Sequence, residues 1–350
     1  ADLGRSAGMN HQFWRDFRAA VKEANPEAVM IAEHYGSPYD WLKGDQWDTV
    51  MNYDAFMEPL SWFLTGMEKH SDEAREDLRG NADAFVNAIC HHMSNMMTPS
   101  LQVSMNELSN HDHSRFLTRT NHKVGRISYA GAEAASEGVN PAVMREAVTI
   151  QMTWPGAPTV YYGDEAGLCG FTDPDNRRTY PWGREDYQMI DFHRVMIRIH
   201  KNYEVLKTGS LGFLWNDYQG LCYARFSRKE QMIVIINNQA ESRDVEIQLW
   251  QAGISRLADT KLKRIVVTSA EGFTEEPEEY TAGDIIRTTE GSLAPIACLD
   301  DVPNRCERQD QCSTLEFWEG LKKVIDQYVD SVTLADLVNN HEEKCGKLNL

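Results

Sequence analysis

Residues that can transfer protons or bind hydroxyl groups follow three short apolar segments of this chain. Glu33 comes directly after VMIA, His111 and Asp112 follow LQVSMNEL, and Asp164 and Glu165 follow TVYYG. Hydrolysis of a glycosidic bond needs a protonated carboxylic acid beside the leaving oxygen and a carboxylate near the sugar ring. Two carboxylates at neighbouring strand ends, such as Glu33 and Asp112, can supply this chemistry, but taken alone a Glu at a strand end is more often an ordinary carboxylate at the rim of the fold.

The segments that precede these residues have the pattern of buried parallel strands. VMIA is short, rich in β-formers and apolar without alternation, as expected of a strand that is covered on both faces. Asn10 is a good N-cap for a helix that Asn25 and Pro26 end. Further strands are expected at DTVMNY, LQVSMNEL and TVYYGDE, and further helices at 72–97, at PAVMREAVTIQM and at DYQMIDFHRVMIRIHKNY. Alternating strands and helices predict right-handed βαβ units.

The position of the polar residues favours a barrel over a doubly wound sheet. A βα barrel keeps its chemistry at the C-terminal ends of its strands, and the sequence lacks the Gly-rich phosphate loop of a doubly wound fold. A closed barrel needs eight strands in about 250 residues, whereas residues 1–204 supply four. The predicted fold class is α/β, with the last four βα units of a (β/α)8 (TIM) barrel in residues 1–204.

Two further domains are predicted after the barrel segment. Residues 205–284 contain short alternating segments (LCYARF, QMIVIIN, DVEIQLW) separated by polar turns, which predict an antiparallel β-sandwich. Residues 285–350 are predicted to form a cysteine-containing helical tail, with helices at LEFWEGLKKVIDQYVDSV and TLADLVNN.

A series of motifs in register carries a family resemblance. IAEHYG, MNYDAF, LSNHDHSRFLTR, PGAPTVYYGDEAG and DPDNRRTYPW resemble, in order and spacing, the second half of glycoside hydrolase family 13, the α-amylase family, and most of all its neopullulanase and cyclomaltodextrinase branch. The resemblance implies retaining hydrolysis of an α-glucan such as maltodextrin, starch, pullulan or cyclodextrin. It gives Glu33 the role of general acid and base, and Asp112 that of transition-state stabiliser, with His111 donating to the same sugar.

The same resemblance adds residues that would bind substrate, each with a simpler alternative. Asp173 and Arg177 match residues that hold the sugar one unit further from the cleaved bond, although a loop-stabilising ion pair is nearly as common a role. Tyr35, Trp41 and Trp182 could stack on sugar faces, but packing is the more frequent role of barrel aromatics.

One part of the family pattern is missing from the sequence. The family's nucleophilic Asp lies at the end of the fourth strand, and the opening ADLGRSAGMNHQFW resembles the stretch that follows it. Asp2 has no preceding strand to orient it and is a poor substitute. The isolated chain is therefore expected to be weakly active or inactive. Hydrolysis requires no cofactor, and the sequence leaves a calcium requirement, the bond preference and the oligomeric state open.

The tail has a second resemblance. YTAGDIIRTTEGSLAPIACLDDVPNRCERQDQCSTLEFWEGLKKVIDQYVDSVTLADLVNN is similar to the C-terminal part of iron-sulfur-sensing winged-helix transcription regulators. The residues that match its cluster ligands are Cys298, Cys306 and Cys312. Leu315 replaces the usual histidine, so a fourth ligand is missing. Zinc completed by Cys345 or His341 is an alternative, and an empty reduced loop is favoured over both.

Charge and hydropathy limit the remaining possibilities. The net charge of -18 and the missing DNA-reading helices make a nucleic acid an unlikely partner, whereas a neutral α-glucan oligosaccharide fits. No apolar run of about 20 residues suggests a membrane span, and a cytoplasmic protein is expected. Two alternatives to the hydrolase stay open: a fragment of an iron-sulfur-responsive regulator, and a sugar-binding remnant without catalysis.

Overall fold

The structure is a computed structural model of the chain, and it describes residues 7–254, 262–275, 281–300, 306, 308–337 and 340. Asp2, His341 and Cys345 therefore lie outside the described residues. The chain forms two compact units, the first built from Ala1–Lys261 with Thr268–Gly272 and the second from Leu262–Val267 with Phe273–Leu350. Among the described helices, none is both long and apolar enough to cross a membrane.

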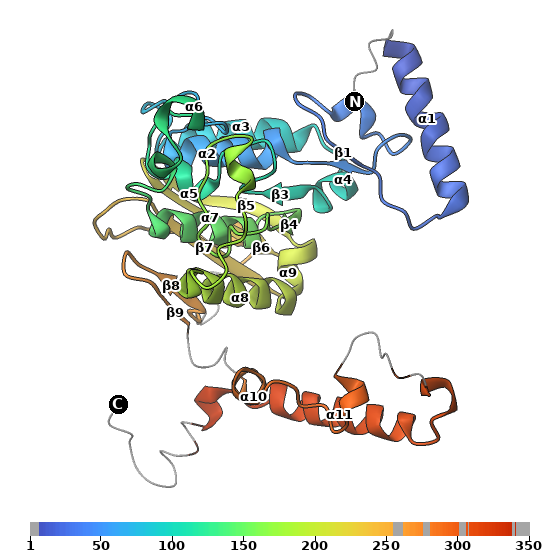
Figure 1. The fold of residues 1–350 in the computed structure, drawn as a ribbon. Helices are drawn as coiled ribbons and strands as arrows, with labels where there is room; N and C mark the ends of the chain where they lie inside the picture. The colour runs from blue at the N-terminus through green and yellow to red at the C-terminus, as the bar shows by residue number, and fades with distance from the viewer. Residues whose placement is uncertain are drawn as a thin grey trace. The chain divides into compact units, whose positions relative to one another are not determined.

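Four short parallel strands organise the first unit (Figure 1). They are β1 (Ile31–Ala32), β2 (Thr49–Val50), β3 (Met105–Glu107) and β4 (Ala157–Thr159). β1 pairs in parallel with β2, and β3 pairs in parallel with β4. A parallel bridge between Met51 and Met105 joins the two pairs. The loops that follow β1, β3 and β4 therefore leave the strands in the same direction.

Helices precede and follow the parallel strands of the first unit. They are α1 (Ala7–Ala24), α2 (Glu58–Thr65), α3 (Ala82–Ser94), α4 (Thr98–Gln102), α5 (Phe116–Arg119), α6 (Ile127–Ala130), α7 (Pro141–Thr153), α8 (Tyr187–Asn202) and α9 (Glu204–Thr208). The helix predicted at 72–97 is shorter than expected: α3 starts at Ala82, where the Asn81 side chain accepts a hydrogen bond from the Ala84 amide at 2.9 Å and caps the helix.

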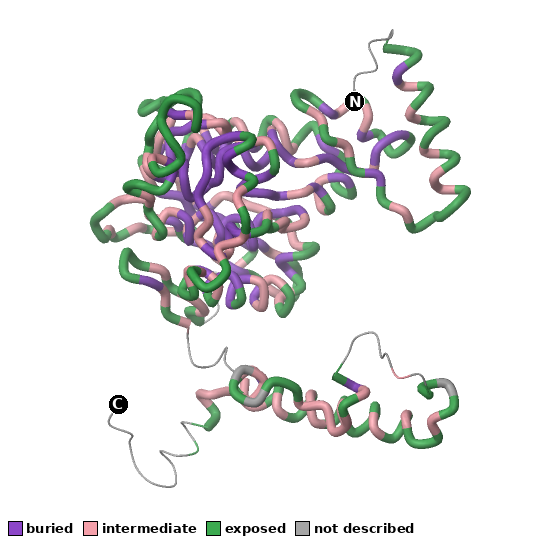
Figure 2. Tube along the Cα trace, in the orientation of Figure 1, coloured by how far each residue is buried: buried purple, intermediate pink, exposed green. Residues whose placement is uncertain are grey.

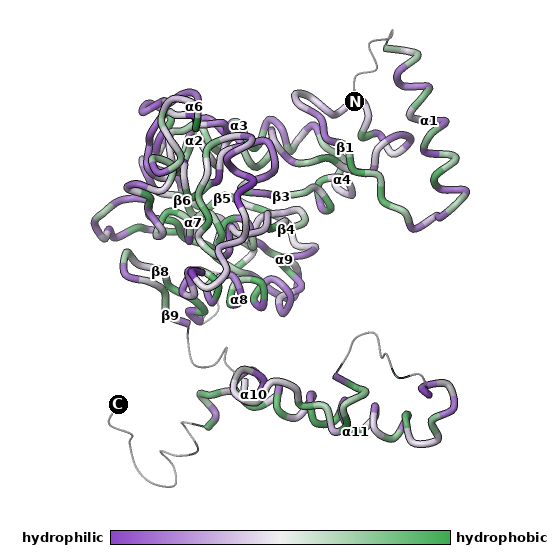
Figure 3. The backbone as a smooth tube through the Cα atoms, viewed as in Figure 1, coloured by the Kyte–Doolittle hydropathy of each residue, from purple (hydrophilic) through white to green (hydrophobic). Residues whose placement is uncertain are grey.

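The core of the first unit surrounds α7. Asn140 caps this helix and Pro141 occupies its first turn, a favourable position for proline. Most of its residues are buried because it contacts α2, α5, α8 and β7 (Gln231–Asn237). Figure 2 shows buried residues in α7 and α8, and Figure 3 shows hydrophobic residues in the same helices.

An antiparallel sheet completes the first unit. It consists of β5 (Ser210–Asp217), β6 (Gly220–Phe226) and β7, with β6 in the centre. β6 and β7 match the predicted LCYARF and QMIVIIN strands, whereas β5 was not predicted. The predicted DVEIQLW strand is wrong, because residues 243–248 are irregular and a short 3-10 helix follows at Leu249–Ala252.

The second unit contains β8 (Val266–Thr268) except for its last residue, then β9 (Phe273–Glu275), α10 (Ala282–Glu290) and α11 (Leu315–Asp330). β8 pairs with β9. Thr281 and Asp284 form a capping box at the start of α10. Arg287 ties α10 to α11 through an ion pair with Asp330 at 2.8 Å. No residue of α11 is buried, so this helix presents a large surface to solvent (Figure 2).

Candidate functional site

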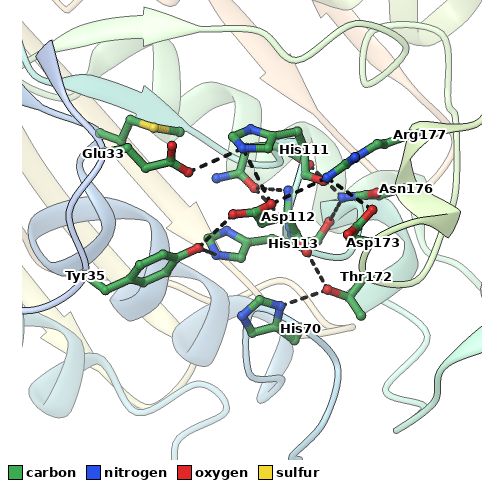
Figure 4. Close-up of polar contacts among 12 residues, drawn as sticks. Glu33, Tyr35, His70, His111, Asp112, His113, Thr172, Asp173, Asn176 and Arg177 are labelled. Atoms are coloured by element: carbon green, nitrogen blue, oxygen red, sulfur yellow. Dashed lines mark hydrogen bonds and ion pairs between the residues drawn. The ribbon is translucent and has the colours of Figure 1, made fainter. Parts of the chain in front are cut away.

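Most of the polar residues predicted from the sequence lie close together, as Figure 4 shows. Glu33 follows β1, His111 and Asp112 follow β3, and Asp173 and Arg177 lie in the loop after β4. Parallel strands that end at the same edge bring these loops together although as many as 144 positions separate Glu33 from Arg177 in the sequence.

Glu33 and Asp112 face the same imidazole. His111 Nε2 lies 3.3 Å from Glu33 Oε1 and 3.5 Å from Asp112 Oδ1. Ligand atoms of the three side chains all lie within 4.8 Å of one another. The Glu33 side chain is 45% exposed and that of Asp112 is 32% exposed. Both carboxyl groups are therefore open to a molecule arriving from solvent.

Asp112 has polar contacts at both carboxylate oxygens. Tyr35 donates its hydroxyl hydrogen to Asp112 Oδ2 at 3.2 Å. Oδ1 faces His111 and also Arg177 Nη2, which lies 3.7 Å away. Arg177 in turn pairs with Asp173 at 3.1 Å and donates to the His111 carbonyl oxygen at 3.0 Å. The pair thus stabilises the loop and faces the site at the same time.

Tyr35 and His113 have fixed protonation states. Burial and the negative charge of Asp112 raise the pKa of Tyr35 to about 12, so its hydroxyl stays a donor. Burial lowers the pKa of His113 to about 2, so its ring is neutral near pH 7. His113 Nε2 lies 3.2 Å from the Tyr35 oxygen. His113 Nδ1 faces the Met57 sulfur at 3.0 Å, so the ring is held between Tyr35 and Met57.

Asn110 and Asn176 shape the loop that carries His111 and Asp112. Asn110 Oδ1 accepts the backbone N–H groups of Asp112 at 3.0 Å and of His113 at 2.9 Å, a turn for which asparagine is well suited. Asn176 Nδ2 donates to the carbonyl oxygens of Asn110 and His113 at 2.9 and 2.7 Å. The loops after β3 and β4 are thereby joined directly.

A buried arginine, Arg115, also holds the loops after β3 and β4 together. Arg115 forms an ion pair with Asp164 at 2.9 Å and donates to the carbonyl oxygens of Tyr162 and Asn176. Its guanidinium also lies over the Tyr161 ring, 4.1 Å from the centroid. Removal of either charged partner would leave an unpaired buried charge, so Asp164 has a structural role.

The predicted aromatic residues differ in their surroundings. Trp41 stacks on Trp47 with ring centroids 5.0 Å apart and donates to Asn10 Oδ1, so it packs. Trp182 is 79% exposed and touches Tyr180, with ring centroids 4.5 Å apart. Tyr35 lies at the site itself, stacked on Tyr53.

The metal predictions have less support from the geometry. Within the described residues, the only group of three possible ligands is Glu33, His111 and Asp112, and one imidazole with two carboxylates does not fit calcium, which takes six to eight oxygens. The described cysteines Cys298, Cys306 and Cys312 are partly buried and do not form such a group. The iron-sulfur cluster at these cysteines stays a prediction from the sequence.

His113 and Asn176 are among the residues of the site that the sequence does not predict. His113 is the second histidine of NHDH, and only its contact with Tyr35 reveals its role. Asn176 occurs in a motif that was used for Asp173 and Arg177 alone. The spacing of residues in the sequence indicates neither of them, because each contacts a loop that is far away in the sequence: His113 contacts Tyr35, and Asn176 contacts Asn110 and His113.

Comparison with known proteins links both parts of the chain to families. Residues 5–250 match the model described as alpha amylase, catalytic domain. Residues 267–340 match the model of the Rrf2 family, described as an iron-dependent transcriptional regulator.

Individual relatives agree with the first match. Neopullulanase 2 of Thermoactinomyces vulgaris is 33% identical over 251 residues, which are 70% of this chain and 38% of the relative. Cyclomaltodextrinase of Thermoanaerobacter pseudethanolicus is 30% identical over 258 residues, 73% of this chain and 40% of the relative. The crystal structure of a debranching enzyme from Nostoc punctiforme superposes with a TM-score of 0.57 at 30% identity, covering 67% of this chain and 46% of that one. The chain thus spans about two fifths of the curated relatives.

Proposed function

Because its residues 5–250 match the catalytic-domain model, this chain belongs to the α-amylase family, and we propose that it carries the acid and substrate-holding side of a glycosidase site for α-glucans. The observation that carries the proposal is the contact of His111 with both Glu33 and Asp112. Its relatives include enzymes named neopullulanase, cyclomaltodextrinase and amylopullulanase.

The family implies a (β/α)8 barrel, and we assign β1 to β4 to the last four strands of it. The parallel pairing of β1 with β2 and of β3 with β4, together with the bridge at Met51 and Met105, supports this assignment. So does the presence of the polar residues after the C-terminal ends of the strands.

In the proposed reaction Glu33 gives a proton to the glycosidic oxygen as the bond to the leaving sugar breaks. Its exposure allows the leaving group to approach, and the 3.3 Å contact with His111 orients the carboxyl group. The same residue would then take a proton from the water that releases the second sugar, as a retaining mechanism requires.

Asp112 would stabilise the positively charged ring of the transition state rather than attack it. Support comes from the contacts at its two oxygens, because Tyr35 on one side and His111 with Arg177 on the other keep the carboxylate in a fixed orientation. A fixed negative charge that accepts hydrogen bonds from sugar hydroxyls binds the transition state more tightly than the ground state.

Asp173 and Arg177 would bind the sugar one unit further along. Their 3.1 Å ion pair is about half exposed, so hydroxyl groups can reach both side chains. A planar guanidinium beside a carboxylate offers donors and acceptors at a spacing that suits vicinal hydroxyls. Tyr35, with its aromatic face stacked on Tyr53, would border the same sugar path.

The 350-residue chain alone is predicted to hydrolyse little or no starch, maltodextrin or pullulan. A retaining mechanism needs a nucleophilic carboxylate besides the acid, and Asp112 is assigned another role. The test is an assay with nitrophenyl maltoside. Turnover above background that Glu33→Gln abolishes would contradict the prediction, whereas saturable binding of maltooligosaccharide without turnover would agree with it.

A further inference from the structure

We infer that Glu107 is a positioning residue for this site: its buried carboxyl group orients the side chain of Asn110, and Asn110 in turn fixes the backbone that carries His111 and Asp112. Glu107 is the last residue of β3 and is 3% exposed. A carboxyl group that is buried to this degree is unusual unless a hydrogen-bond partner or an opposite charge stabilises it. The inference rests on the proposed function only where sugar binding is measured.

The hydrogen-bond pattern leaves Asn110 one orientation. Its Nδ2 donates to Glu107 Oε1 at 2.8 Å and to the Tyr53 hydroxyl at 3.2 Å. Its Oδ1 accepts from the amides of Asp112 and His113. All four hydrogen-bonding positions of this side chain are thus used. An amide flip would set Nδ2 against the two backbone N–H donors, so these amides select the observed orientation, and Glu107 Oε1 holds it by accepting an Nδ2 hydrogen.

The carboxyl group of Glu107 lies in a field of negative charge. Burial raises the pKa of Glu107 to about 8, the hydrogen bond from Asn110 opposes this, and the carboxylates of Glu33, Asp164 and Asp112 raise it further. Burial and Glu107, in that order, raise the pKa of the facing phenol of Tyr53. Near pH 7 the carboxyl group is therefore mostly protonated, and Oε1 can accept from Asn110 without adding a charge below Glu33 and Asp112.

Two substitutions separate the effect of the hydrogen-bond acceptor of Glu107 from the effect of its side-chain volume. Glu107→Gln keeps an oxygen that accepts from Asn110 and removes the ionisation, whereas Glu107→Leu fills similar space and removes the acceptor. Glu146→Gln is a matched control, because Glu146 also accepts from an asparagine, Asn238, at 2.6 Å, and burial raises the pKa of Glu146 to about 7. Glu146 lies on α7, outside the site.

Amide hydrogen exchange by NMR, at pH 7 on the full chain, measures the positioning directly. In Glu107→Leu we expect the amides of Asp112 and His113 to exchange roughly five to ten times faster, as for loss of one buried hydrogen bond. Glu107→Gln and Glu146→Gln should exchange as the wild type does. Wild-type protection in Glu107→Leu, or equal loss in Glu107→Gln, would overturn the inference.

If Glu107→Leu does not fold, a pH titration of the wild type tests whether Glu107 is linked to the loop that carries Asp112. The amide nitrogen shift of Asp112 should show an inflection near pH 8 that Glu107→Gln lacks and Glu146→Gln keeps. An identical inflection in Glu107→Gln would refute the link. Binding of maltotetraose should weaken in Glu107→Leu and recover in Glu107→Gln. If the wild type binds no maltotetraose, the proposed function fails, while the exchange data still judge the role of Glu107.

Discussion

At the scale of single residues, the site depends on side chains that hold one another before any sugar arrives. Tyr35 and Arg177 contact opposite oxygens of Asp112, and His111 stands between Asp112 and Glu33. Such preorganisation lowers the cost of stabilising charge that develops later. Glu33 and its neighbours therefore form one connected group, and loss of one member is expected to affect the others.

Substitution of Asp112 tests this unit. Asp112→Asn keeps the shape but removes the charge that accepts from Tyr35 and from sugar hydroxyls, so we expect maltotetraose to bind about tenfold or more weakly, in line with loss of a charged hydrogen bond. Isothermal titration calorimetry measures the change. Asp191→Asn, at an exposed ion pair of α8, should leave the affinity as it is, and equal affinities for both variants would speak against the assignment.

The closeness of Glu33 and Asp112 could be predicted from the sequence because each follows an apolar strand in a recognisable motif, and parallel strands bring such positions together. The buried residues that hold their loops in place could not be predicted. Glu107 is buried at the end of β3, where an apolar residue is expected, and His113 is buried under the loop rather than exposed at its tip. The sequence shows which residues are polar but not which of them a loop turns inward.

At the scale of elements, the differences between prediction and structure have local causes. The stretch before α3 is irregular because Gly66 ends α2 in the left-handed conformation, with φ of 66°, and α3 begins only at its asparagine cap. β5 was missed because SLGFLWND does not alternate regularly, and the register shifts between Phe213 and Trp215. DVEIQLW alternates well between apolar and polar residues but forms no strand, since such a pattern becomes a strand only when a neighbouring strand pairs with it.

The contact between α7 and the end of β7 should depend on pH. Burial raises the pKa of Glu146 from 4.5 to about 7, so folding favours its protonated form. Its contribution to stability is complete below pH 4.5 and is lost as the pH rises through 7. The Tm of the wild type should therefore fall relative to that of Glu146→Gln between these pH values. Scanning fluorimetry checks this, and a Tm difference that is constant with pH would exclude the effect.

At the scale of the whole molecule, the described residues of the proposed site all belong to the first unit. The second unit has its own capping box, its own ion pairs and an exposed helix α11. A chain of residues 1–275, which keeps the Ser269 carbonyl that accepts from Arg145, should bind maltotetraose within about twofold of the full chain, since no contact within the site is lost. A large loss of affinity, with the circular dichroism spectrum of the first unit retained, would show that the tail takes part in binding.

An NMR titration of the full chain with maltotetraose and, in parallel, with β-linked cellotetraose tests whether Glu33 and Asp112 border one site for an α-linked glucan. We expect saturable shifts of the Glu33, His111, Asp112 and Arg177 amides with maltotetraose and much weaker ones with cellotetraose. Equal responses to both sugars, or shifts confined to residues away from these loops, would contradict this expectation.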